Sequence, residues 1–294
     1  MMNKMLVLKT AYRIKDALRG TWLGNPETFG SFKRAIKSFL IRFSASDGLI
    51  LTQIYGHSVF VPSSPNLVES YIRRPFEPYT LQLFKSAIKP GAIVLDIGAH
   101  LGVYSLVAAF SMRLEGQVFA FEPDPTNFQI LRRNIEKSHY RNIVPAQKAV
   151  SDACGTFSFF LAESSDCNSF YAHPNSRTKE RISVESITVD SFLAGRTVNV
   201  IKIDVEGHEC KVLRGMRTTI LKSGKIILFI ELNPACLRSA GATPQELISE
   251  LEGLGFTMKL INEEAATLVS VADVAILAKR DPHWYGNLYC VKER

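Results

Sequence analysis

The sequence lacks several features that would assign it to a common class at once. None of its apolar runs approaches the roughly 18 residues that a membrane-spanning helix needs. Its five cysteines are widely spaced without a Cys-x-x-Cys pair, which disfavours a disulfide framework or a structural zinc site and favours a reducing compartment. Lys9 interrupts the apolar start, so we expect no signal peptide. We therefore expect a cytoplasmic protein, with peripheral contact at the inner membrane face left open.

Positive charge is unevenly distributed along the chain. The formal net charge is +7, and residues 1–43 carry nine Lys or Arg against two acids, so the rest of the chain is neutral overall. Residues 3–43 have the pattern of two basic amphipathic helices. Three interpretations stay open: a helical cap on the main domain, contact with an anionic membrane or glycolipid surface, and contact with RNA. We expect an N-terminal arm with a short hairpin at 1–66 and the main domain at 67–294.

Strand-like and helix-like patterns alternate regularly from residue 91 onward. The expected strands of the main sheet are residues 93–97, 118–121, 143–150, 198–204, 226–232, 256–261 and 288–291. Residues 155–161 and 181–189 alternate in polarity and are expected to pair antiparallel with each other. This order predicts an α/β fold, with a seven-stranded, mostly parallel sheet, helices on both faces and a helical N-terminal extension.

The first strand of this series turns into a helix through glycines. The turn is Asp96-Ile-Gly98-Ala-His-Leu-Gly102, and it leaves backbone N–H groups at a helix N-terminus, close to any ligand above it. A dinucleotide site would have Gly-x-Gly-x-x-Gly, and an acid beside it would repel a pyrophosphate. An acid beside the ammonium of an amino-acid moiety would attract it. The motif therefore favours S-adenosylmethionine over NAD.

Two later strand ends supply further polar side chains. Glu122 ends the second strand, twenty positions after Gly102, which suits an acid that binds a ribose diol. Ser151 and Asp152 follow the third strand, where they can meet an adenine amino group. The carboxyl ends of parallel strands lie at one edge of the sheet, so these groups should meet there. The alternative is that Asp96 caps its helix and Glu122 is solvated, in a domain without a cofactor.

Three acids and a histidine follow the fourth strand. They are Asp204, Glu206, His208 and Glu209, with Gly207 allowing a sharp turn. Methyl transfer to an alcohol needs a base that takes the hydroxyl proton, and a carboxylate or imidazole can supply it. The alternative interpretation is that Asp204 caps the next helix and the other side chains are solvated.

These segments form a series of motifs in a fixed order. The series comprises Leu95-Asp-Ile-Gly-Ala-His-Leu-Gly102, Phe121-Glu-Pro123, Ala149-Val-Ser-Asp152, Ile201-Lys-Ile-Asp-Val-Glu-Gly207 with Leu213-Arg-Gly215, and Ile230-Glu-Leu232. It resembles the motif series of FkbM-type methyltransferases. The resemblance implies a class I, Rossmann-like methyltransferase fold, S-adenosylmethionine as cofactor, and O-methylation of a hydroxyl on a sugar, glycolipid or secondary metabolite.

The resemblance also implies roles for individual residues. The cofactor side would comprise Asp96, Gly98 and Gly102 at the methionine end, Glu122 at the ribose and Asp152 at the adenine. From their positions in this sequence we add His100 and Ser151 as cofactor-binding candidates. The family usually has Asn at the position of His100, so we expect backbone contacts there. Asp204, Glu206 and Glu231 would lie at the acceptor side. His208 is a candidate base chosen for the pKa of imidazole, not for the family pattern.

Other functions stay open at this point. We predict no metal ligands, although Asp204 and either Glu231 or Asn233 end neighbouring strands and could hold magnesium. Amine-directed nucleic-acid methyltransferases commonly carry Asn/Asp-Pro-Pro-Tyr/Phe after the fourth strand, where this chain has Asp-Val-Glu-Gly, whose charge would repel phosphate. A non-catalytic adenosyl-binding domain is a further alternative. The sequence names neither the acceptor nor the oligomeric state.

Overall fold

The computed structural model describes residues 47–113, 115–274, 281 and 284–293. Contacts between Cα atoms divide the chain into two units, residues 1–50 and 51–294, and the fold described below is that of the second. The amphipathic helices expected at residues 3–43 lie outside the described residues, and the domain boundary between residues 66 and 67 stays a prediction. None of the described helices is both long enough and apolar enough to cross a lipid bilayer.

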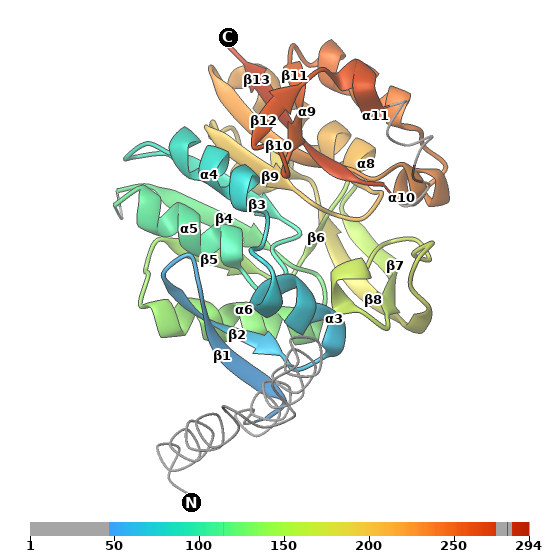
Figure 1. The fold of residues 1–294 in the computed structure, drawn as a ribbon. Coiled ribbons are helices and arrows are strands. Elements are labelled where there is room, and N and C mark those ends of the chain that lie inside the picture. Colours follow the sequence, from blue (N-terminus) through green and yellow to red (C-terminus); the bar gives the residue numbers. More distant parts are fainter. Residues whose placement is uncertain (1–46, 114, 275–280, 282–283, 294) are drawn as a thin grey trace, which may run out of the picture. The chain divides into compact units, whose positions relative to one another are not determined.

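The main sheet of the second unit is mostly parallel (Figure 1). Its strands lie in the order β12 (Thr267–Val269), β11 (Thr257–Asn262), β13 (Gly286–Lys292), β10 (Ile226–Leu232), β9 (Val200–Ile203), β3 (Ile93–Ile97), β4 (Gln117–Phe121) and β5 (Ile143–Ala146). Neighbours from β10 to β5 are parallel, whereas β13 runs antiparallel to both β10 and β11. The predicted Rossmann-like fold is confirmed, with eight strands instead of seven because the short β12 pairs with β11.

Helices cover both faces of this sheet (Figure 1). One face carries α4 (Pro78–Ala87), α5 (Val103–Ser111) and α6 (Pro125–Ser138), and the other carries α7 (Val189–Leu193), α8 (Glu209–Gly215), α9 (Arg217–Lys222) and α11 (Pro244–Gly253). Polar caps fix where helices begin: Asp124 accepts the N–H of Thr126 in α6, and Thr243 forms a capping box with Glu246 in α11. The short α10 (Pro234–Ser239) follows β10.

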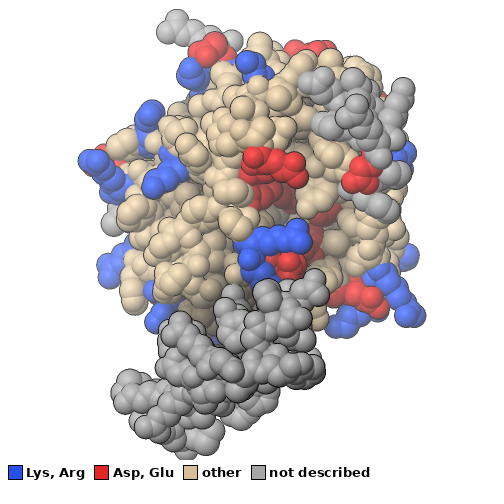
Figure 2. Space-filling view, viewed as in Figure 1, with Lys and Arg blue, Asp and Glu red and all other residues tan. Residues whose placement is uncertain are grey.

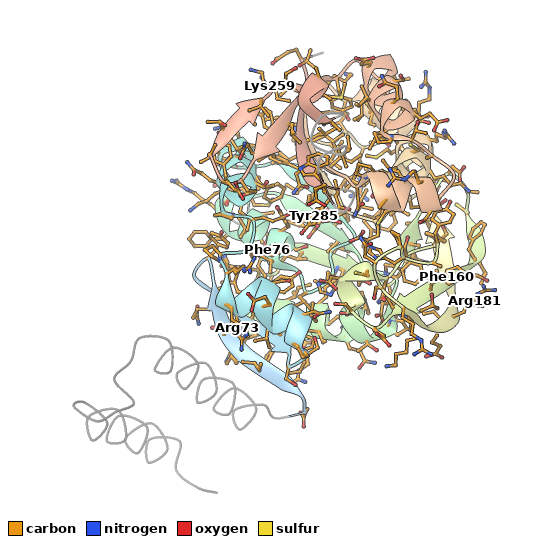
Figure 3. All side chains as sticks on the ribbon, turned by 45° about the vertical axis from the view of Figure 1, so that its right-hand side comes forward. Arg73, Phe76, Phe160, Arg181, Lys259 and Tyr285 are labelled. Carbon is orange, nitrogen blue, oxygen red and sulfur yellow. The ribbon has the colours of Figure 1, made fainter. Side chains whose placement is uncertain are left out.

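A second, three-stranded sheet interrupts the series after β5. It consists of β6 (Ala149–Val150), β8 (Thr178–Ile187) and β7 (Gly155–Ala162), with β7 and β8 antiparallel as expected. Arg181 of β8 lies over the ring of Phe160 in β7, with 4.5 Å to the ring centroid (Figure 3). The prediction of one strand at 143–150 was wrong, because β5 pairs with β4 in the main sheet and β6 pairs with β8 in the second.

Local contacts define several further helix ends. The side chain that caps α7 is Thr188, whereas Asp190 accepts hydrogen bonds from the N–H and hydroxyl of Thr219 at the start of α9. Helices α8 and α9 meet at Met216. The segment before α4 contains α3 (Pro65–Val68) and the π-helix η2 (Glu69–Arg73).

The ends of β3 and β9 approach each other closely enough to require glycine. Gly98, just after β3, has φ +83°, and a Cβ there would lie 1.8 Å from the backbone oxygen of Asp204. Only glycine combines this backbone conformation with such a contact. The turn after β3 and the end of β9 are thereby held together at the carboxyl edge of the sheet.

Candidate active site

A cavity of about 920 Å³ lies where the ends of β3, β4, β9 and β10 meet. This volume is in the range of small-molecule sites, which is roughly 300–1,000 Å³. Its lining is strongly acidic, with Glu69, Glu77, Asp96, Glu122, Asp166, Asp204, Glu206 and Glu231 against Arg74, Lys148 and Lys202. Figure 2 shows acidic side chains around a hollow near the centre of one face. A cavity with this charge favours cationic ligands and repels polyanions.

Two acids from the ends of β3 and β4 form one side of the cavity. Asp96 is 2% exposed, and its Oδ2 accepts a hydrogen bond of 2.5 Å from the Ser105 hydroxyl. Burial raises the pKa of Asp96 to about 6, and the bond from Ser105 opposes the shift. Glu122 accepts the N–H of His100 at Oε2 and that of Asp124 at Oε1, both at 2.9 Å. Burial raises the pKa of Glu122 to about 8 against these two bonds.

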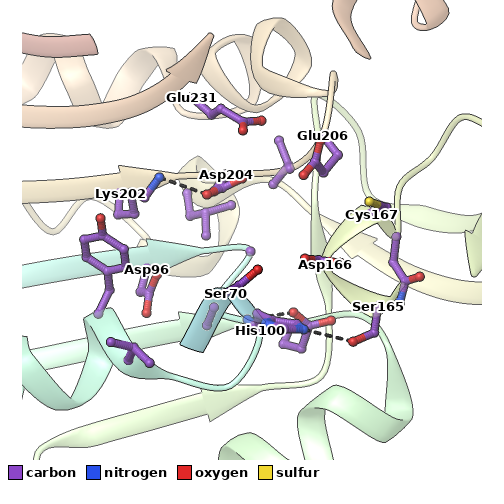
Figure 4. Close-up of a pocket in the computed structure, with 18 of the residues that line it drawn as sticks. Ser70, Asp96, His100, Ser165, Asp166, Cys167, Lys202, Asp204, Glu206 and Glu231 are labelled. Atoms are coloured by element: carbon purple, nitrogen blue, oxygen red, sulfur yellow. Dashed lines mark hydrogen bonds and ion pairs between the residues drawn. The ribbon is translucent and has the colours of Figure 1, made fainter. Parts of the chain in front are cut away.

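Three acids from the ends of β9 and β10 form the other side. One carboxylate oxygen from each of Asp204, Glu206 and Glu231 lies within 4.8 Å of the others, and Figure 4 shows the three side chains around one space. Glu231 is 6% exposed, and its Oε2 has no hydrogen-bond partner among the described residues. Burial, and then the charges of Glu206 and Asp204, raise the pKa of Glu231 well above its ordinary value.

A buried lysine partly compensates this charge. Lys202 is 1% exposed, and its Nζ lies 3.0 Å from Asp204 Oδ2 and 2.9 Å from Asn287 Oδ1. Burial alone would lower the pKa of Lys202, but Asp204 and Glu77 outweigh it and raise the pKa, so the ammonium stays charged. Glu77 accepts hydrogen bonds from Tyr104 and Asn287, and its side chain does not cap α4. The hydrogen bonds of Lys202 therefore go to Asp204 and Asn287, and none goes to Glu206 or Glu231.

Glu206 has different partners. Its Oε2 lies 3.3 Å from His173 Nε2 and accepts a hydrogen bond of 3.2 Å from the Cys236 thiol. The backbone N–H of Asn175 donates to His173 Nδ1, so the ring proton lies on Nε2 and faces Glu206. Burial raises the pKa of Glu206, opposed by His173 and reinforced by Asp204. Sequence reasoning missed His173, because a loop residue carries no periodic signal.

A histidine connects two segments that line the cavity. His100 Nδ1 is hydrogen-bonded to the Tyr71 hydroxyl of η2 at 2.9 Å, and Nε2 to Ser165 at 3.0 Å, in the 3₁₀-helix η3 (Ser165–Cys167). Phe76 stacks on Tyr71, and both Phe76 and Tyr285 line the cavity near the middle of the molecule (Figure 3). The His100 side chain is therefore engaged by the protein, and burial lowers its pKa.

The structure brings most of the sequence-predicted residues together. The predicted residues that line the cavity are Asp96, Gly98, His100, Glu122, Asp204, Glu206 and Glu231. Gly102, Ser151, Asp152 and His208 are not among the lining residues. Gly102 lies at the start of α5, where a Cβ would be 2.5 Å from Leu131, so its role is in packing. Pro123, Lys148 and Val150 line the part of the cavity expected for Ser151 and Asp152.

The candidate base His208 lies outside the cavity. It is 4% exposed, stacks on Phe170 with ring centroids 4.0 Å apart, and its Nε2 is hydrogen-bonded to Ser151 at 2.8 Å. Burial lowers the pKa of His208 to about 3. The structure gives the prediction of His208 as a base no support, because the imidazole does not line the cavity and burial lowers its pKa.

The chain matches a known family and individual relatives. The family described as "Methyltransferase FkbM domain" matches residues 96–258. The hexuronic acid methyltransferase AglP of Haloferax volcanii is 28% identical over 174 residues, which are 58% of this chain and 66% of that protein. The chain thus spans just under two thirds of AglP. The 31-O-demethyl-FK506 methyltransferase FkbM of Streptomyces tacrolimicus is 25% identical over 205 residues, covering 58% of this chain and 75% of that protein.

Solved structures give a more distant likeness. The M. jannaschii TYW2 protein, solved in complex with AdoMet, has 11% sequence identity and a TM-score of 0.44, with 85% of this chain and 88% of that chain covered. A precorrin-6y C5,15-methyltransferase from Geobacter metallireducens has 13% identity and a TM-score of 0.40, with 73% and 86% covered. Both TM-scores are below 0.5, and nothing further follows from these likenesses.

Proposed function

Because this chain belongs to the FkbM family of methyltransferases, we propose that it methylates a hydroxyl oxygen of a sugar, glycolipid or secondary metabolite. The chain is a methyltransferase, and S-adenosylmethionine is its cofactor. The observation that carries the proposal is that acids from β3, β4, β9 and β10 line one cavity. The names of two relatives support the acceptor class, since one acts on a hexuronic acid and the other's name specifies an O-demethyl substrate.

The side formed by β3 and β4 fits the cofactor. A carboxylate at Asp96 suits an ammonium group, and the Ser105 hydroxyl holds that carboxylate in place. Each oxygen of Glu122 accepts one backbone N–H and keeps a further lone pair, which suits the two hydroxyls of a ribose. Gly98 lines the cavity between them without a side chain. When bound, S-adenosylmethionine supplies an electrophilic methyl group on a positively charged sulfur.

The side formed by β9 and β10 fits the acceptor. In the transfer, a C–O bond forms at the hydroxyl oxygen, the C–S bond breaks, and the hydroxyl proton goes to a base. We assign the base to Glu206, because its carboxylate lines the acceptor side of the cavity and contacts His173 and the Cys236 thiol, and burial also raises its pKa. His173, 3.3 Å away, orients this carboxylate from the loop between β7 and β8. Asp204 lies beside Lys202, which fixes its position.

An RNA acceptor is the alternative suggested by the basic residues 1–43. The cavity lining has eight acids against three Lys or Arg side chains. Even with Glu122 and Glu231 protonated because of their raised pKa values, the acids outnumber the cations, which disfavours a phosphate backbone. The charge of the cavity therefore favours a neutral hydroxyl acceptor over a nucleic acid.

The test is a transfer assay with tritiated-methyl S-adenosylmethionine against four fractions: glycolipids, polysaccharide precursors, small metabolites and RNA. We expect label in one of the first three, in a methyl ether that resists mild alkali. The Glu206→Gln variant should lose transfer, while the Glu252→Gln variant, altered at an exposed acid of α11, should retain it. Label only in RNA, or on nitrogen, would contradict the proposal.

A further inference from the structure

We infer that Asp204, Glu206 and Glu231 form a binding site for a divalent cation that prefers oxygen ligands, such as Mg²⁺ or Mn²⁺. The inference deepens the proposed function, on which its catalytic role rests, because these acids lie on the acceptor side of the same cavity. Binding of the ion itself can be measured without turnover.

The spacing of the three carboxylates fits one ion. One oxygen from each residue lies within 4.8 Å of the others. An ion with metal–oxygen distances of about 2.1–2.6 Å places its ligands no more than about 4–5 Å apart. Figure 4 shows Glu231 from β10 and Asp204 and Glu206 from the segment after β9 around the same space. The three side chains thus converge without a change of backbone.

Glu231 gives a second, independent indication of a missing partner. Its side chain is 6% exposed, it lines the cavity, and its Oε2 has no hydrogen-bond partner among the described residues. A buried carboxylate without a donor or counter-charge is costly. The ammonium of Lys202 offsets part of this charge, but its hydrogen bonds go to Asp204 and Asn287 and not to Glu231. A cation between the three acids would offset the remaining charge.

The ligand chemistry selects the type of ion. Three carboxylate oxygens favour hard cations such as Mg²⁺ and Mn²⁺. A neighbouring group, His173, Glu206 and Cys236, would suit a softer ion, but the Cys236 thiol donates its hydrogen to Glu206, and burial raises its pKa, so it stays protonated. Asn233, which the sequence left open as a ligand, uses its Oδ1 to accept the N–H groups of Ala235 and Cys236.

Three protein ligands leave part of a six-coordinate shell for other oxygens. A hydroxyl held there would give up its proton to the base more readily, because the ion would stabilise the alkoxide. An acceptor with two neighbouring oxygens, such as a sugar diol or a uronic acid, fills two of the open positions. The site therefore favours acceptors that can bind the ion through two oxygens.

The test is titration of chelator-treated full-length protein with MnCl₂, followed by the electron paramagnetic resonance signal of free Mn²⁺ and by calorimetry. We expect binding of one Mn²⁺ per chain, displaced by MgCl₂. The Glu231→Gln variant should bind at least about tenfold more weakly, since it loses an anionic ligand but keeps its shape. Glu252→Gln should bind as the unaltered protein does. Thermal unfolding and S-adenosylmethionine binding without metal establish that each variant is folded.

The outcomes separate this inference from the proposed function. No Mn²⁺ binding at millimolar concentration, or equal affinity in Glu231→Gln, would overturn the ion site. Equal loss of affinity in Cys236→Ala would also overturn it, because the ion would then lie at the histidine–cysteine group. Methyl transfer to a hydroxyl that persists in chelator would remove the catalytic role of the ion but keep the proposed function. Mn²⁺ binding without methyl transfer to any hydroxyl acceptor would keep the ion site but contradict the proposed function.

Discussion

Both sides of the cavity carry carboxyl groups, but the two sides differ in how many hydrogen-bond donors the chain supplies to them. On the β3–β4 side, Asp96 and Glu122 both accept hydrogen bonds from donors of the chain itself. On the β9–β10 side, three carboxylates lie within 4.8 Å, and an oxygen of Glu231 has no donor among the described residues. On the first side, both acids have hydrogen-bond donors and keep further lone pairs for a ligand. On the second side, negative charge is only partly compensated, which is why we expect a cation and a reacting hydroxyl there.

The two sides are also joined in a specific way. A Cβ on Gly98 would lie 1.8 Å from the backbone oxygen of Asp204, so the two backbones are close. The Lys202 ammonium donates to Asp204 and also interacts with the charges of Glu77 and Glu231. The comparison therefore predicts that changes on one side leave the other side's ligand in place, except where the backbones touch.

Removing the base should have the largest effect. Glu206→Gln keeps the shape of the side chain but cannot take a proton, so turnover should fall by roughly 100- to 10,000-fold. The affinity for S-adenosylmethionine, measured by calorimetry, should change less than about twofold. Glu252→Gln is the matched control for an exposed acid. Equal losses of turnover and cofactor affinity in Glu206→Gln would mean that the two sides are not separate.

Gly98→Ala should affect both sides together. The new Cβ would lie 1.8 Å from the Asp204 oxygen, at a positive φ, so the ends of β3 and β9 must separate. We expect the free energy of unfolding to fall by about 3 kcal/mol, measured by urea titration. Gly224→Ala is the control, because a Cβ there meets nothing within 4 Å. Similar stabilities of the two variants would contradict the close contact.

Asp96→Asn should act on the cofactor side alone. A charge-assisted hydrogen bond to the ammonium is lost, so affinity for S-adenosylmethionine should fall about 10- to 100-fold. Mn²⁺ binding should be unchanged, because Asp96 is not one of the three acids within 4.8 Å. Unchanged cofactor affinity would remove Asp96 from the site.

The pH dependence of stability should reveal the cost of burying the Glu122 charge. Burial raises the pKa of Glu122 from 4.5 to about 8, so the folded state holds this proton more tightly than the unfolded chain does. Without cofactor, the free energy of unfolding should therefore fall as the pH rises from 4.5 toward about 8. Glu122→Gln should weaken this fall, while Asp96 and Glu209, whose pKa values are raised to about 6 and about 8, contribute the part that remains. If Glu122→Gln and the unaltered chain show the same pH dependence of stability, the raised pKa of Glu122 is contradicted.

The sequence predicted the strand ends well, because parallel strands bring their carboxyl ends to one edge. Asp96, Glu122, Asp204 and Glu231 follow buried apolar runs that are legible as strands, and all four line the cavity. The sequence did not predict that β5 and β6 belong to different sheets, since an apolar run does not reveal which strand each half pairs with.

Residues in loops could not be placed in this way. His208 is four positions after Asp204, but its ring stacks on the outer side of a lining residue, Phe170, and does not itself line the cavity. His173 enters the cavity from a loop whose sequence has no periodicity, and only the fold brings it to Glu206. Their positions depend on turn geometry and long-range packing, which a pattern of apolar residues does not encode.

The most direct test of the account is a crystal structure with S-adenosylhomocysteine and Mn²⁺. We predict the amino-acid moiety at Asp96 and Gly98, the ribose at Glu122, and the sulfur directed toward Asp204, Glu206 and Glu231, with Mn²⁺ between these three. A ligand bound elsewhere, or a sulfur directed away from the three acids, would contradict the division of the cavity into a cofactor side and an acceptor side.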